Sequence, residues 1–308
     1  MTSSRLPRKS PPSTSTEKGL LYDLKLPDEH FDDLWEAVIV EPSIKARLLS
    51  QAVLNFTLRP KINPAEVPLH GVILMEGPPG TGKTSLARGL ASRVADILSI
   101  NTMHYLEVEP HGLASGQLGR SQQAVRNLLS GVVAERATAG PLIVVLDEVE
   151  TLAADRQRLS LEANPVDVHR ATDAVLAQLD HLALQHTNIL IIATSNFPQA
   201  IDRAFLSRSD LVMHIGLPNA EACSGIVRDT LRGLAKAVPK LTSLADSKEI
   251  ETFGRLCEGM DGRRIRKAVT SALALSKELA LAPEKLTLHE VREALRLAHA
   301  NLKMEIKK

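Results

Sequence analysis

The sequence has little cysteine, almost no net charge and no long apolar run. Two cysteines, Cys223 and Cys257, form neither a metal-ligand pair nor a disulfide framework, so a reducing compartment, the cytoplasm, is expected. With 37 basic and 36 acidic side chains, no overall field draws the chain to nucleic acid or to an anionic membrane. No apolar run approaches the length that spans a bilayer, and the basic start leads into Ser, Pro and Thr instead of a signal core. Direct binding to nucleic acid or membrane is therefore not expected.

What the sequence does contain is a phosphate-binding loop. Residues 77–84 match G-x-x-x-x-G-K-[ST], between an apolar run at residues 72–75 and a helical pattern. The glycines let successive backbone N–H groups point at anionic phosphates, at the positive end of the following helix. Lys83 is predicted to reach the β- and γ-phosphates, and the Thr84 hydroxyl to ligate Mg²⁺. The sequence thus predicts that a nucleoside triphosphate is bound, together with Mg²⁺ at Thr84, by a loop made of Gly77, Pro78, Pro79, Gly80, Thr81, Gly82, Lys83, Thr84 and Ser85.

Short apolar runs alternate with helical patterns through the first two thirds of the chain. Such alternation predicts an α/β fold with a parallel sheet covered by helices on both faces, whose ligands lie at the carboxyl ends of the strands. Residues 1–19 are low in complexity and are expected to be disordered. We expect a large α/β domain over residues 20–218 and a small all-helical domain over residues 219–308. The expected strands after the loop are Tyr105 to Val108, Leu142 to Leu146, Ile189 to Ala193 and Leu211 to Ile215.

Two carboxylates and an amide follow expected strands. Asp147 and Glu148 come directly after the apolar run that ends at Leu146, downstream of the phosphate loop. Asp147 is predicted to hold Mg²⁺, usually through water, and Glu148 to act as general base on the attacking water. Asn196 also follows a strand and is expected to bind the γ-phosphate or to orient the water.

Three other segments allow two interpretations each. Val38, Ile39 and Val40 would either cover an adenine ring or form a core strand. The arginines within residues 201–210 and 259–266 would either face solvent or supply cations against the charge that develops in phosphoryl transfer.

The order of these elements resembles the AAA+ ATPases and, within them, the pachytene-checkpoint family of HORMA-remodelling ATPases. The resemblance covers nearly all of the chain after the first 19 residues. The glutamate after Val149 and the stretch Ala-Val-Leu-x-Gln-Leu-Asp at residues 174–180 are more particular to this family than the loop and the acidic pair. The other residues that carry it are Phe31 to Trp35, Gly77 to Ser85, Leu146 to Val149, Thr194 to Asn196, Ile201 to Asp210, Gly262 and Arg263.

The resemblance implies a homohexamer that hydrolyses ATP at subunit interfaces. Arg208 would reach the neighbour's γ-phosphate as an arginine finger, with Arg203 a poorly spaced second, and Arg263 would sense the nucleotide of its own subunit. Pore loops would grip a polypeptide, the first at Gly116, Gln117, Leu118 and Gly119, the second within residues 155–167. The first departs from the family pattern, because Gln117 stands where an aromatic residue is usual.

The resemblance also implies a partner. About two dozen residues precede the expected ATPase core, as in bacterial members that open a closed HORMA-domain protein, dissociate it from a cyclic-oligonucleotide synthase and keep anti-phage signalling off. We expect the same of this chain. Three other functions stay open: a DNA-associated AAA+ switch, a general unfoldase that feeds a protease, and a scaffold without hydrolysis. Intact Lys83, Asp147, Glu148 and Asn196 argue against the scaffold.

Overall fold

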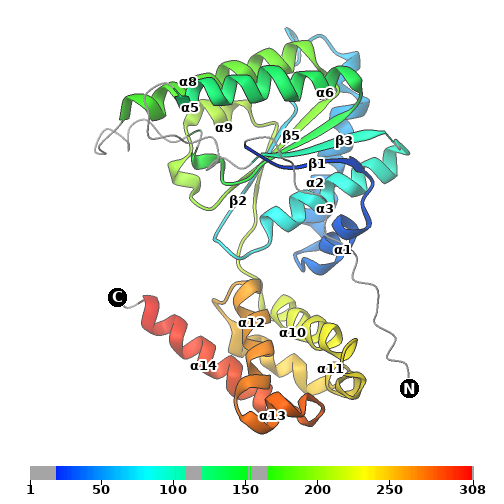
Figure 1. The fold of residues 1–308 in the computed structure, drawn as a ribbon, viewed down its shortest axis with the longest axis vertical. Coiled ribbons are helices and arrows are strands. Elements are labelled where there is room, and N and C mark those ends of the chain that lie inside the picture. The colour runs from blue at the N-terminus through cyan, green and yellow to red at the C-terminus, as the bar shows by residue number, and fades with distance from the viewer. Residues whose placement is uncertain (1–18, 101, 109–119, 152, 154–164, 307–308) are drawn as a thin grey trace. The chain divides into compact units, whose positions relative to one another are not determined.

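The chain folds as two compact units in a computed structural model that describes residues 19–100, 102–108, 120–151, 153 and 165–306 (Figure 1). The first unit consists of residues 19–36, 42–77 and 83–214, and the second of residues 37–41, 78–82 and 215–306. Periodicity predicted a division at residue 219; the two short segments that join the second unit lie far from it in sequence and carry no periodic signal. None of the described helices is long and apolar enough to cross a membrane.

The first unit is built on a mixed sheet of six strands in the order β1-β3-β4-β5-β2-β6. Strands β3, β4, β5, β2 and β6 run parallel to one another, which confirms the predicted parallel sheet. Strand β1 pairs antiparallel with β3 and was not predicted, because its residues are mostly half-buried and lack a clean alternation. The strands are β1 (Leu20–Leu26), β2 (Val72–Glu76), β3 (Met103–Val108), β4 (Leu142–Leu146), β5 (Ile189–Ser195) and β6 (Leu211–His214).

Helices cover both faces of this sheet, with α1, α2 and α3 on one side and α5, α6 and α8 on the other (Figure 1). The helices on the first side are α1 (Glu29–Ala37), α2 (Pro42–Thr57) and α3 (Lys83–Leu98). On the other side lie α5 (Arg120–Arg126), the π-helical η2 (Asn127–Val133), α6 (Ala134–Ala139) and α8 (Pro165–Gln185). Short elements complete the unit: η1 (Arg59–Lys61), η3 (Val149–Thr151), η4 (Pro198–Ala200) and α9 (Arg203–Arg208).

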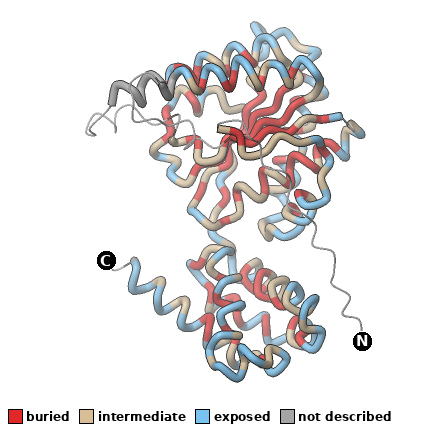
Figure 2. Tube along the Cα trace, viewed as in Figure 1, coloured by how far each residue is buried: buried red, intermediate tan, exposed pale blue. Residues whose placement is uncertain are grey.

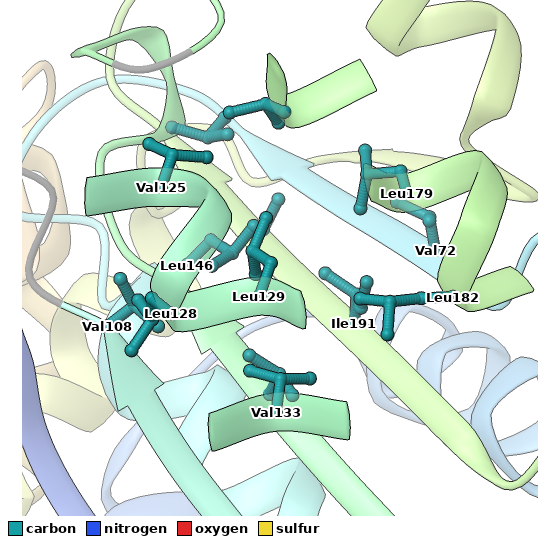
Figure 3. Close-up of a cluster of buried hydrophobic side chains, with 14 of the residues drawn as sticks. Val72, Val108, Val125, Leu128, Leu129, Val133, Leu146, Leu179, Leu182 and Ile191 are labelled. Carbon is teal, nitrogen blue, oxygen red and sulfur yellow. The ribbon is translucent and has the colours of Figure 1, made fainter. Parts of the chain in front are cut away.

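The core of the first unit lies between the sheet and these helices. All five residues of β4 are apolar and buried (Figure 2). A continuous apolar run of this kind is typical of a central strand that is covered on both faces. Leu128, Leu129 and Val133 of η2 lie over the sheet with Leu179 and Leu182 of α8 (Figure 3). Each fully buried aliphatic side chain of this kind contributes about 1.5–3 kcal/mol.

A buried arginine links the first residue of β5 to helix α8 and to the segment that precedes β2. Arg59 is only 2% exposed. Its Nε donates to the carbonyl of Leu69 at 3.0 Å, its Nη1 to that of Ile189 at 2.7 Å and its Nη2 to that of Ala183 at 2.9 Å. Asn55 adds an amide donor to the Ile189 carbonyl at 3.0 Å. One side chain therefore satisfies carbonyls from three separate segments.

The second unit is helical in its C-terminal part. Its core contains Cys223, Ile226, Phe253, Ile265 and Leu295, all buried. Its elements are α10 (Ala220–Ala235), η5 (Pro239–Leu241), α11 (Thr242–Ala245), η6 (Lys248–Cys257), α12 (Gly262–Ser271), η7 (Ala272–Ala274), α13 (Lys277–Leu281), η8 (Pro283–Lys285) and α14 (Leu288–Ile306).

The segment at residues 38–40 is not a strand, so the core-strand interpretation of it is wrong. Ile39 packs against the helical core of the second unit and approaches Gly225, where an added β-carbon would lie 3.1 Å from its Cδ1. Val38 packs against Gly82 of the phosphate loop, where an added β-carbon would lie 3.1 Å from its Cγ1.

Candidate functional site

The phosphate loop leads from β2 into α3 in the predicted strand-loop-helix context. Lys83, the first residue of α3, is only 5% exposed, and its Nζ donates to the Gly77 carbonyl at 2.8 Å. A buried ammonium at the start of a helix, where it donates to a backbone carbonyl of the same loop, fits a group that exchanges this hydrogen bond for phosphate oxygens.

The middle of the loop packs within the second unit. Gly80 has φ +80°, and a β-carbon there would lie 2.2 Å from Oδ1 of Asp261, so only glycine fits. Asp261 caps α12 by accepting from the Arg264 N–H at 2.9 Å. The N–H of Arg263 donates to the Gly80 carbonyl at 3.3 Å. The loop is thus backed by the first turn of α12, and the guanidinium-bearing side chain of Arg263 is exposed there.

Two hydroxyl groups converge on Asp147, the first residue after β4. The Thr84 hydroxyl donates to Oδ1 of Asp147 at 2.8 Å, and the Thr194 hydroxyl at the end of β5 donates to the same oxygen. Hydroxyl and carboxylate oxygens are hard ligands of the kind that Mg²⁺ takes together with water and nucleotide oxygens. The structure therefore brings Thr84 and Asp147 together, and these groups fit Mg²⁺.

Glu148 adopts a backbone conformation that is rare for a residue with a side chain. Its φ is +52°, and its N–H donates to the Thr194 hydroxyl at 3.2 Å. The Asn196 side-chain amide donates to Oε1 of Glu148 at 3.0 Å. Strain of this kind persists where surrounding contacts hold it, and it gathers at functional sites. The two predicted residues, one after β4 and one after β5, thus meet at one carboxylate.

Two members of this site escaped sequence analysis as site residues. Thr194 bridges Asp147 and the Glu148 backbone, as described above. Glu150, in η3, accepts from the Asn196 N–H at 3.1 Å through Oε1, while its Oε2 is buried without a hydrogen-bond partner in the described part of the chain. The sequence could have indicated Glu150 as a third acidic residue, two positions after Glu148. Its hydrogen bond with Asn196 could not be predicted, because it depends on the pairing of β4 with β5.

Arg208, the last residue of α9, is held by a carboxylate of its own chain. Its Nε and Nη2 donate to Oδ1 and Oδ2 of Asp180 at 2.6 and 2.7 Å. This hydrogen bonding lowers the pKa of Asp180 and raises that of Arg208. Arg203, at the other end of α9, is exposed. Residues 116–119, the predicted first pore loop, and residues 155–164 of the second lie outside the described residues.

Comparison with known proteins places these features in a family. A model described as "ATPase family associated with various cellular activities (AAA)" matches residues 73–217. CD-NTase-associated protein 6 of Pseudomonas aeruginosa is 55% identical over 291 residues, covering 94% of this chain and 96% of the relative. The pachytene checkpoint protein 2 homolog of Arabidopsis thaliana is 34% identical over 275 residues, covering 79% of this chain and 59% of the relative. The chain thus spans about three fifths of that plant relative.

Solved structures share the fold. The structure of C. elegans PCH-2 matches with a TM-score of 0.71 at 25% identity, covering 95% of this chain and 78% of that one. A chain from the HORMA:CdnC:Trip13 complex of E. coli MS115-1 matches with a TM-score of 0.73 at 18% identity, covering 90% of this chain and 95% of that one. At that identity the second likeness concerns the fold alone.

Proposed function

The chain belongs to the pachytene-checkpoint family of AAA ATPases, and from this premise we propose that it uses ATP hydrolysis to open a closed HORMA-domain protein. The observation that supports hydrolysis is the geometry at the sheet edge, where Thr84 meets Asp147 and Asn196 meets Glu148. A scaffold without hydrolysis has no need for a strained glutamate held by an amide.

The residues divide the chemistry among them. Lys83 would leave the Gly77 carbonyl and bind the β- and γ-phosphates, while Thr84 and Asp147 would hold Mg²⁺, partly through water. Bound Mg²⁺ neutralises charge between those phosphates. Glu148 would take a proton from the attacking water at Oε1 or Oε2, and Asn196 would fix the orientation of that carboxylate. Glu150 would keep the Asn196 backbone in place.

We propose a homohexamer in which each nucleotide lies at a subunit interface. Arg208 would act on the neighbour's γ-phosphate, and Arg263 on the nucleotide of its own subunit; a cation against transition-state charge increases such rates about 10³- to 10⁵-fold. Gly116, Gln117, Leu118 and Gly119 would grip the substrate polypeptide in the central pore. The predicted domain division, the nucleotide-contacting residues 77–85 and the cytoplasmic location belong to the same proposal.

The proposed partners are a HORMA-domain protein and a cyclic-oligonucleotide synthase bound to it. One comparison supports this choice, because the 55% identical relative is named for association with a CD-NTase. A chain from a complex of HORMA, CdnC and Trip13 shares the fold. Opening of the HORMA protein would release the synthase and keep anti-phage signalling off.

The test is ATP hydrolysis with and without a purified HORMA protein encoded beside this chain, together with Glu148→Gln. We expect the partner to stimulate hydrolysis, Glu148→Gln to trap the partner in an ATP-dependent complex, and only the intact enzyme to separate it from the synthase. Hydrolysis without any HORMA binding would refute the substrate and leave the ATPase. A salt-dependent shift of DNA, or degradation of an unrelated tagged protein with a protease, would favour the competing functions.

A further inference from the structure

Arg208 and Asp180 form a fork-to-fork pair within the first unit. Asp180 lies near the C-terminal end of α8, and Arg208 ends α9. Nε and Nη2 of the guanidinium each donate to a different oxygen of the carboxylate, at 2.6 and 2.7 Å. The remaining nitrogen, Nη1, donates to the Ala204 carbonyl one turn earlier in α9 at 2.8 Å. Such parallel hydrogen bonds fix the plane of a guanidinium as well as its position.

The pattern of these hydrogen bonds determines which N–H donors of Arg208 remain available to a ligand. A guanidinium carries five N–H donors, one on Nε and two on each Nη. Three are engaged, one on each nitrogen. Among the described residues, none accepts from the remaining donors, one on Nη1 and one on Nη2. A side chain with one donor left on each terminal nitrogen is suited to take two oxygens of a single phosphoryl group.

Stability alone does not explain this pair. The side chains of Arg208 and Asp180 are 22% and 42% exposed, so neither charge is sealed in the core. Ion pairs at such positions contribute little to folding free energy. The other charged group printed near the carboxylate is His70, whose Nε2 lies 4.0 Å from Oδ1 of Asp180. Asp180 instead fixes the orientation of the Arg208 guanidinium, because the two hydrogen bonds hold a long, rotatable side chain in one conformation.

We propose that Asp180 is a positioning residue for ATP hydrolysis, which holds Arg208 so that its two remaining terminal donors bind the γ-phosphoryl group of nucleotide in another subunit. This inference rests on the proposed role of Arg208 as an arginine finger. It also gives a role to the Ala-Val-Leu-x-Gln-Leu-Asp stretch at residues 174–180: Val175 and Leu179 are buried in the core, and the aspartate at its end reaches Arg208.

Steady-state ATP hydrolysis by the full chain, without any HORMA protein, tests the proposal. We expect Arg208→Ala to lower kcat at least about 100-fold. Asp180→Ala should lower kcat about tenfold with less than about a twofold change in KM for ATP, since misaimed groups lose rate more than binding. Asp180→Asn keeps one acceptor oxygen and should lose only about threefold. The double variant Asp180→Ala/Arg208→Ala should equal Arg208→Ala, because Asp180 acts only through Arg208.

A matched control separates positioning from general destabilisation. Arg136 donates to Asp23 through Nε and Nη2 at 3.2 and 2.7 Å, in the same unit and with similar exposure. Asp23→Asn should change the melting temperature about as much as Asp180→Asn does and leave kcat within about twofold. Melting temperatures of all variants are measured alongside the rates.

Four results would overturn the proposal. Wild-type kcat in both Asp180 variants would remove the positioning role. A loss of rate in Asp23→Asn as large as that in Asp180→Asn would assign the effect to stability. A further loss in the double variant beyond Arg208→Ala would show that Asp180 acts by another route. Full activity of Arg208→Ala would remove the finger. Each outcome is independent of HORMA remodelling, because no HORMA protein is present.

Discussion

The side-chain amide of Asn196 holds the carboxylate of Glu148 at 3.0 Å across two neighbouring strands. Asn196→Asp would place a second carboxylate against it. The change removes the amide donor that orients Glu148 and sets a like charge against it. We expect kcat to fall about 100-fold, because the general base loses the group that holds it in place. Steady-state hydrolysis measures the change, and the wild-type rate would contradict it.

Thr194 offers a test of the hydroxyl that links Asp147 to the backbone of Glu148. Thr194→Val keeps the shape and removes both hydrogen bonds, whereas Thr194→Ser keeps the hydroxyl. We expect valine to lower kcat about tenfold to 100-fold and to raise the Mg²⁺ concentration needed for half-maximal rate, because outer-shell partners tune metal ligands. Serine should stay within about threefold of wild type. Equal loss in both variants would refute a role for the hydroxyl.

Mixed assemblies test whether Arg208 acts on a neighbouring subunit. Arg208→Ala subunits keep their own hydrolytic carboxylate, and Glu148→Gln subunits keep their finger. In an equal, random mixture of two inactive variants, about one quarter of interfaces would combine an intact site with an intact finger. We expect about a quarter of wild-type ATPase activity to return after subunit exchange. No recovery, with mixed assemblies verified by mass spectrometry, would place Arg208 outside the neighbour's site.

The buried Arg59 is expected to be a stability residue without a direct role in hydrolysis. Arg59→Met removes the donor of the partly buried Leu69 and Ala183 carbonyls and one of two donors to the buried Ile189 carbonyl. Each lost hydrogen bond costs about 0.5–1.5 kcal/mol, so the free energy of unfolding should fall by about 1.5–4.5 kcal/mol. Urea denaturation measures the change. The kcat measured at a temperature about 20 °C under the melting temperature should be unaffected. A lower kcat at that temperature would contradict a purely stabilising role for Arg59.

Cys223 and Cys257 report on the integrity of the second unit. Burial raises the pKa of Cys223 from 9.0 to about 11 and that of Cys257 from 9.0 to about 12. Both thiols therefore stay protonated in the folded protein at pH 8, and iodoacetamide should modify them only as fast as the unit unfolds. The neutral thiols favour the folded state fully below pH 9, and this contribution is lost as pH rises towards 11 and 12. Rapid native-state alkylation at pH 8 would contradict the burial.

Local patterns predicted much of this structure. The loop at residues 77–84 and the strand before Asp147 are each specified by consecutive residues, so they can be recognised without knowledge of the fold. Strand β1 could not be predicted in the same way, because its pairing with β3 decides its conformation and its own sequence does not.

The contacts between elements were also beyond sequence analysis. Glu150 lies beside Asn196, and Asp180 beside Arg208, only because distant segments are brought together. The positions of these residues in the sequence do not indicate that they are close in space. The family resemblance marked both acids as characteristic, and the structure supplies the partner of each.

The distribution of the chain between the two units constrains how the protein can be recombined. The chain passes between them after residues 36, 41, 77, 82 and 214, five times in all. A chimaera joined at residue 215 would therefore receive foreign helices without the residues 37–41 and 78–82 that pack with them. The foreign residue that replaces Asp261 would then have to pack against Gly80, whose close contact in this chain is with Asp261. A functional exchange of the second unit between relatives therefore has to transfer residues 37–41, residues 78–82 and the part from residue 215 onward together. The helical part cannot be exchanged without the middle of the phosphate loop.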